Sequence, residues 1–178
     1  IHQFSFAIIH STTIVLPAWR KACKDHSMQS RLIPRDVCTR WNSLYDMLIV
    51  AIEYHEVVNS LTSDRTLSLR DYEITDLEWD ILDDMVYALK DATILFSADS
   101  KSTIAHVLTT IDKIDGLITS IIVPAHRQRT LHSSIRNALK LAKKTMNCYY
   151  SVTDESNVYR IATGPSNLFL LCSKSDAR

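Results

Sequence analysis

Two groups of residues in this sequence have side chains and spacings that could support metal chemistry. Cys23 and His26 form the motif CKDH, a spacing found in zinc sites. A zinc site needs four ligands, and Cys38 has no partner at ligand spacing, so a structural role is favoured for these residues. The sequence therefore predicts no metal site and no cofactor.

Acidic side chains are also frequent on one predicted helix. Two-metal catalytic sites hold carboxylates on a rigid scaffold with the ions about 4 Å apart. Here the carboxylates are expected on an exposed, solvated helix face, and His55 is expected to be a hydrogen-bonded core residue. No residue is therefore predicted to be catalytic. The carboxylates considered are Asp76, Asp80, Asp83 and Asp84.

The stretch RLIPRDVCTRWNSLYDML contains a different kind of chemistry, because Trp41 directly follows Arg40 where a helix is predicted to begin. An indole stacks on any base, and a neighbouring guanidinium can hold a phosphate. Helix starts also favour phosphate, and Arg35 lies close in sequence. The alternative is that Trp41 packs on the following helix. We expect Trp41 to be more exposed than Trp19 and Trp79.

Apolar residues recur at helical spacing along most of the chain. The spacing predicts helices over residues 43–61, 77–96 (after a capping box at Thr75 and Glu78), 104–121 and 131–150. Residues 4–24 fit either a strand or a helix; we favour a helix kinked at Pro17. Glycine occurs only at Gly116 and Gly164, which excludes a phosphate loop or a dinucleotide-binding turn. The predicted fold class is an all-α bundle.

Apolar residues of the 104–121 helix, five isoleucines and one valine, follow an a/d spacing, which suits either a coiled-coil dimer or packing within the chain. Because three other amphipathic helices are predicted, packing within the chain is favoured. The residues concerned are Ile104, Val107, Ile111, Ile114, Ile118 and Ile121.

Charge is segregated although the 178-residue chain has zero formal net charge. Residues 127–147 include six basic residues and no acidic one. Arg136, Lys140 and Lys143 are expected on one helix face, opposite an apolar face. This basic face either is solvated or paired with the acidic helix, or forms a phosphate-contacting stripe. The residues expected to point inward from this helix are Ile135, Leu139, Ala142, Met146 and Tyr149.

The four cysteines are scattered, with no CxxC pair, which indicates reduced thiols in an intracellular protein. The apolar runs are too short to span a bilayer, so neither a membrane nor a nucleotide cofactor is an expected partner.

The segment that contains Asp36, Arg40, Trp41 and Ser43 resembles the D-x-x-TRWNS-x-YDML motif of hAT-superfamily transposases of fungal type. The resemblance extends over residues 6–162. These enzymes have an RNase H-like catalytic core with an Asp-Asp-Glu triad, interrupted by an all-α insertion domain. The chain is similar to that insertion domain, so none of the three catalytic residues can be assigned here.

The resemblance further implies that Arg40 and Trp41 contact DNA near transposon ends, that the protein is nuclear, and that no enzyme activity follows from this segment alone. We expect a helical domain over residues 1–162 and a poorly ordered tail over 163–178. The predicted function is a catalytically incomplete transposase fragment with DNA-binding potential. The alternative is a helical protein-interaction domain that does not bind DNA.

Overall fold

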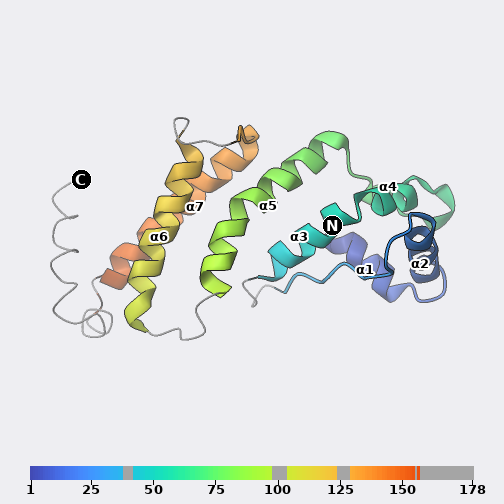
Figure 1. The fold of residues 1–178 in the computed structure, drawn as a ribbon, viewed down its shortest axis with the longest axis horizontal. Coiled ribbons are helices and arrows are strands. Elements are labelled where there is room, and N and C mark those ends of the chain that lie inside the picture. The colour runs from blue at the N-terminus through green and yellow to red at the C-terminus, as the bar shows by residue number, and fades with distance from the viewer. Residues whose placement is uncertain (38–41, 98–103, 124–128, 155, 157–178) are drawn as a thin grey trace. The chain divides into compact units, whose positions relative to one another are not determined.

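The computed structural model describes residues 1–37, 42–97, 104–123, 129–154 and 156 (Figure 1). Within these ranges the regular structure is helical and contains no strand, which confirms the predicted all-α fold class. The α-helices are α1 (His2–His10), α2 (Val15–Asp25), α3 (Ser43–Glu53), α4 (His55–Ser63), α5 (Asp76–Ser97), α6 (Ile104–Ile122) and α7 (Ser133–Asp154). Two short 3₁₀-helices, η1 (Arg65–Leu67) and η2 (Arg70–Tyr72), connect α4 to α5.

The chain divides into two compact units, Ile1–Thr93 and Ile94–Arg178. The predicted domain boundary after residue 162 and the predicted tail over 163–178 lie outside the described residues. None of the described helices is long and apolar enough to cross a membrane.

An aromatic cluster forms the centre of the first unit. Phe4 and Trp19 meet edge to face with ring centroids 6.2 Å apart, and Trp19 stacks on Tyr54 at 5.6 Å. All three side chains are at most 2% exposed. Aromatic pairs in these geometries add to the free energy gained from burying their large apolar surfaces. The cluster therefore joins α1, α2 and the α3–α4 junction into one core.

The extended segment over residues 28–37 is attached to this core through its backbone. Three buried side chains, from α1, α2 and the α3–α4 junction, donate hydrogen bonds to three alternate carbonyls of the segment, which is the period of an extended chain. These bonds satisfy backbone acceptors that no strand partner is available to satisfy. They are Tyr54 Oη to Gln29 O at 2.6 Å, Trp19 Nε1 to Arg31 O at 3.1 Å and Ser5 Oγ to Ile33 O at 2.8 Å.

The first predicted helix is in fact two helices. The chain turns between α1 and α2, where Ser11 Oγ accepts a hydrogen bond from Val15 N at 3.2 Å. The prediction of a kink at Pro17 is therefore wrong. Pro17 lies in the first turn of α2, where a proline is tolerated because the backbone N–H it lacks would have no partner within the helix.

The predicted 43–61 helix is also divided, at Tyr54, into α3 and α4. Seven residues at helical spacing predict the buried face of this helix. Five of them are buried, while Leu44 and His55 are half-buried. His55 Nε2 lies 2.9 Å from Asn59 Nδ2, and its ring meets Trp79 edge to face, which confirms a hydrogen-bonded histidine. The five buried residues are Met47, Leu48, Ala51, Val58 and Leu61.

Helix α2 ends in a left-handed turn that uses serine instead of glycine. Ser27 has φ of 56°, and its N–H donates to Lys24 O at 3.0 Å. The N–H of Met28 donates to Cys23 O at 2.8 Å, which completes a Schellman motif. This turn directs the chain from α2 into the extended segment.

The capping box predicted at the start of α5 is confirmed. Glu78 Oε2 accepts a hydrogen bond from Thr75 N at 2.8 Å, and Glu78 N donates to Thr75 Oγ1 at 3.4 Å. The donated N–H and hydroxyl groups of Thr75 lower the pKa of Glu78 from its ordinary value. The local sequence therefore defines where α5 begins.

Two predictions for the sides of α5 are wrong. Leu77 begins the apolar spacing that predicts the 77–96 helix and its buried face, but it is 59% exposed. Asp84, expected on a solvated face, is only 5% exposed, and Asp83 is half-buried; both have interaction partners. The reason is that the buried side of α5 changes along its length, with Trp79 and Ala88 buried on different sides.

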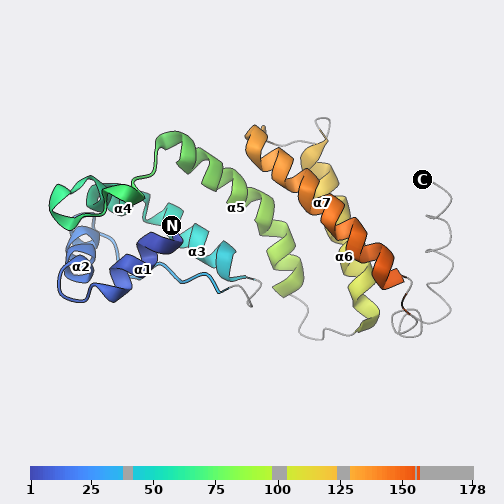
Figure 2. The same ribbon diagram turned by 180° about the vertical axis from the view of Figure 1, so that it is seen from behind.

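Helices α6 and α7 lie side by side in the second unit (Figure 2). Ile114 is buried, and Ile111, Ile118 and Ile121 are half-buried, which confirms that the isoleucine face packs within the chain. The side chains of Ile104 and Val107 lie outside the described residues.

The predicted inward face of α7 is correct only in part. Ile135 is buried, and Leu139 and Met146 are half-buried. Ala142 and Tyr149 are exposed, because the helix packs on α6 through a face centred on Leu139 and Met146.

Replacing Tyr54 with phenylalanine tests whether the extended segment depends on its hydrogen bond to Gln29. We expect Tyr54→Phe to lower the free energy of unfolding by about 0.5–1.5 kcal/mol, since the Gln29 carbonyl loses the phenol donor and keeps the N–H of Arg31 at 2.8 Å, while the ring is retained. Urea denaturation measures this change. Tyr149→Phe is the matched control because Tyr149 is 69% exposed; equal stabilities of all three proteins would contradict the prediction.

The capping box predicts a dependence of stability on pH. Because the pKa of Glu78 is lower in the folded chain, its contribution is complete above the ordinary pKa of 4.5 and is lost as pH falls through the folded value. We expect Glu78→Gln to remove this component, so the two proteins differ most at neutral pH and converge in acid. Thermal unfolding between pH 7 and pH 3 measures it, and parallel curves would refute it.

Candidate nucleic-acid interface

The Ser43 side chain connects the two ends of the segment that contains Arg40 and Trp41. Ser43 Oγ accepts a hydrogen bond from Val37 N at 2.9 Å. Its single proton can go to Asp36 Oδ1 at 2.7 Å or to Val37 O at 2.9 Å. Ser43 is only 4% exposed, so these contacts are shielded from water. Residues 37 and 43 are therefore held together, with residues 38–41 between them.

Arg35 comes just before Asp36 in the chain, and its side chain lies against Phe6 of α1. Its guanidinium carbon is 5.7 Å from the centroid of the Phe6 ring, within the range of a cation–π contact. Both side chains are exposed, and Ile33 beside them is buried. The contact orients Arg35 while leaving its N–H groups accessible to an anion.

Arg40 and Trp41 lie outside the described residues, so the exposure predicted for Trp41 stays a prediction. The two tryptophans chosen for comparison are buried, Trp19 at 0% and Trp79 at 7% exposure. Each donates its indole N–H within the first unit, Trp19 to Arg31 O and Trp79 to Asn59 Oδ1 at 3.0 Å. Both are structural residues.

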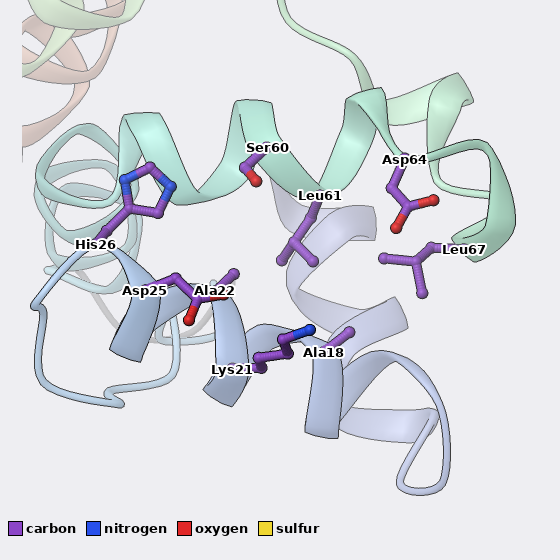
Figure 3. Close-up of a pocket in the computed structure, with 9 residues that line it drawn as sticks. All are labelled: Ala18, Lys21, Ala22, Asp25, His26, Ser60, Leu61, Asp64 and Leu67. Carbon is purple, nitrogen blue, oxygen red and sulfur yellow. The ribbon is translucent and has the colours of Figure 1, made fainter.

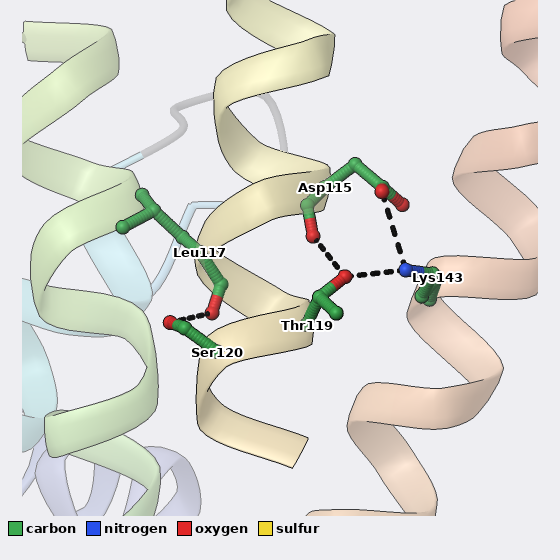
Figure 4. Close-up of polar contacts among 5 residues, drawn as sticks. All are labelled: Asp115, Leu117, Thr119, Ser120 and Lys143. Atoms are coloured by element: carbon green, nitrogen blue, oxygen red, sulfur yellow. Dashed lines mark hydrogen bonds and ion pairs between the residues drawn. The ribbon is translucent and has the colours of Figure 1, made fainter. Parts of the chain in front are cut away.

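The basic face predicted on α7 does not form as a continuous exposed stripe. Lys143 points toward α6, where its ammonium lies 3.2 Å from Asp115 Oδ2 and also contacts Thr119 Oγ1 (Figure 4). Arg136 is half-buried, and only Lys140 is exposed. Lys143 therefore does not lie opposite the packed face, because α6 supplies an acidic partner for it. Of the alternatives for this face, pairing with an acidic residue holds for Lys143, and phosphate contact stays a prediction.

The CKDH motif spans the end of α2. Cys23 is completely buried, and this burial raises the pKa of its thiol. His26 is exposed at the helix end, beyond the last turn. In the part of the chain that the structure describes, no group of three or more His, Cys, Asp and Glu residues could hold a metal ion. Cys38 lies outside these residues.

A cavity of about 230 Å³ lies between α2 and α4 (Figure 3). Ala22 and Leu61 are buried in its wall, while Lys21, Asp25 and Asp64 surround its opening. The pKa of Asp64 is lowered by the hydroxyl and N–H of Thr66, which it accepts at 2.7 and 2.8 Å. Carboxylates and an ammonium of mixed sign do not select one class of ligand, so this cavity adds nothing to the interface.

Sequence reasoning missed the contact between Asp36 and Ser43. Both residues belong to the D-x-x-TRWNS motif, and their spacing of seven residues suits a closed loop with a hydroxyl at its base. These two polar residues were therefore the feature of the sequence that could have predicted the contact. In the structure they bond to each other on either side of residues 38–41 in the chain.

The described residues are all-α, and Ser43 bonds to Asp36 and Val37 across the connection between α2 and α3. Residues 8–88 match the family model of the ZBED1 RNase-like helical domain, which is less than half of the chain. The match supports a helical segment of hAT transposase type. Residues 89–162 and the fungal type, both included in the expected resemblance, stay predictions. No curated protein and no solved structure shows a significant match.

Replacing Ser43 with alanine tests whether its hydroxyl closes the segment. We expect Ser43→Ala to lower the free energy of unfolding by about 1–2 kcal/mol, since Val37 N–H loses its acceptor in a buried site. Chemical denaturation measures this loss. Ser63→Ala is the control, because Ser63 is exposed and its hydroxyl bonds only to Asn59 O within α4. Equal losses in both variants would contradict the proposed closure.

Proposed function

We propose that this chain is a helical segment of hAT transposase type that contacts DNA through Arg35, Arg40 and Trp41. The observation that supports it best is the family match over residues 8–88, since this range contains all three residues. The Ser43 closure adds a physical reason, because it restricts the ends of the segment before any DNA is bound. Less conformational entropy is then lost on binding.

The chemistry of these side chains suits single-stranded or unpaired nucleotides. An indole stacks on any base, and guanidinium groups hold phosphates through charge-assisted hydrogen bonds. In α7, Lys140 is the member of the predicted basic set available for a phosphate contact. Lys143 has its charge balanced by Asp115, and Arg136 is half-buried. We therefore assign the α7 face a lesser role than the Arg40–Trp41 segment.

The proposal includes no catalytic residue. The resemblance relates the chain to an insertion domain, whereas the catalytic carboxylates of the family belong to a separate sheet. We accordingly propose DNA contact without cleavage by these residues, and a nuclear protein, as the family resemblance implies.

Replacing Trp41 with alanine tests the stacking role. We expect Trp41→Ala to weaken binding of a hairpin DNA by about 1–3 kcal/mol, the usual contribution of one stacked base, with little change in stability. Fluorescence anisotropy measures the affinity, and urea denaturation measures the stability. Lys140→Ala is expected to lower the slope of log affinity against log salt concentration by up to about one.

Two matched variants separate this outcome from general effects. Tyr149→Ala removes an exposed aromatic residue from α7, and Lys113→Ala removes an exposed positive charge from α6. Neither is expected to change hairpin affinity. A strongly destabilised Trp41→Ala protein with unchanged DNA affinity would show instead that Trp41 is a core residue.

A further inference from the structure

Helix α7 has an exposed apolar stripe that the hairpin with α6 does not use. Leu141, Tyr149 and Val152 are 65%, 69% and 65% exposed. Their neighbours on this side of the helix are small or apolar, and no charged residue interrupts the stripe. We refer to the following six exposed residues as the α7 stripe: Leu141, Ala142, Thr145, Cys148, Tyr149 and Val152.

The α7 stripe is distinct from the face that packs on α6. At 3.6 residues per turn, its centre at Thr145 lies roughly a quarter turn from the packed face near Leu139 and Met146. Its members recur at three- and four-residue intervals from Leu141 to Val152. This spacing is the one that a second helix fills along a helix–helix seam.

Basic residues border the stripe on its other side. Lys140 and Lys144 are both exposed, and helical spacing places Lys144 between Lys140 and the Leu141–Cys148 edge. Residues 133–153 contain no acidic residue. The accessible surface of α7 is therefore an apolar band beside a positively charged one.

We propose that the α7 stripe is a docking site for an acidic amphipathic helix of a partner protein. The helical spacing fits a helix as occupant, and the lysines call for glutamates or aspartates beside its apolar face. A second copy of α7 is a poorer partner, because it brings lysines without an acidic residue to face them. Nucleic acid is also poorer, because the stripe itself offers no phosphate contact. This inference does not depend on the proposed DNA contact.

The test uses the full chain and two designed helical peptides. Both have leucines at a and d positions; one has glutamates at the flanking positions and the other lysines. We expect fluorescence anisotropy to show binding of the glutamate peptide, with the lysine peptide at least roughly tenfold weaker. Equal affinity for both peptides, or no binding of the glutamate peptide, would overturn the proposal.

Paired substitutions locate the binding site. Leu141→Glu is expected to weaken binding of the glutamate peptide by roughly tenfold or more, while Ile14→Glu, which changes a residue 61% exposed between α1 and α2, leaves it unchanged. Lys144→Glu is likewise compared with Lys113→Glu in α6. Circular dichroism confirms that each variant is folded. Equal effects within either pair, or complete competition by hairpin DNA, would overturn the assignment to this stripe.

Alkylation of Cys148 gives a second measurement, separate from fluorescence anisotropy. It is exposed within the stripe, whereas Cys23 is buried in the core of the first unit. Site-resolved alkylation by iodoacetamide should be fast at Cys148 in the free chain, slow at Cys23, and slowed at Cys148 by the glutamate peptide. Slow alkylation of Cys148 in the free chain would show that the stripe is already covered, and would refute the proposal.

Discussion

Three hydrogen bonds from buried side chains fix the 28–37 segment on the helical core of the first unit. Ser5 lies in α1, Trp19 in α2 and Tyr54 between α3 and α4, and they donate to alternate carbonyls of one segment. A segment without a strand partner would otherwise bury unsatisfied acceptors, which costs more than the bonds contribute net. The same aromatic rings form the core. Packing of the helices and placement of the segment therefore depend on the same side chains.

The candidate DNA-contacting residues follow directly from this arrangement. Ile33 is buried with its carbonyl bound by Ser5, and two residues later Arg35 is exposed beside Phe6. Ser43 then binds Val37 and Asp36 at the start of α3. A rigid core thus presents a short segment whose ends are restrained, which is the usual arrangement of binding residues on a scaffold.

Helix α7 illustrates how one sequence can supply two surfaces. Its packed side meets α6, where Lys143 forms an ion pair with Asp115 and donates a hydrogen bond to Thr119. Its other side exposes Leu141, Tyr149 and Val152 beside two lysines. Lys140 borders both a possible phosphate contact and the α7 stripe, whereas Trp41 belongs only to the first proposal and Leu141 only to the second. Substitutions at Trp41 and Leu141 therefore test the two proposals separately.

The sequence by itself determined the helical fold, the capping box of α5 and the buried positions of α3 and α4, because these follow from local spacing and short-range hydrogen bonds. Only the tertiary structure decided that Asp84 is buried, that Lys143 faces Asp115 and that Tyr149 is exposed. A periodic pattern shows that a helix has an apolar face, but not which neighbour covers it. The bonds to residues 29, 31 and 33 link positions up to 28 residues apart, so no local signal announces them.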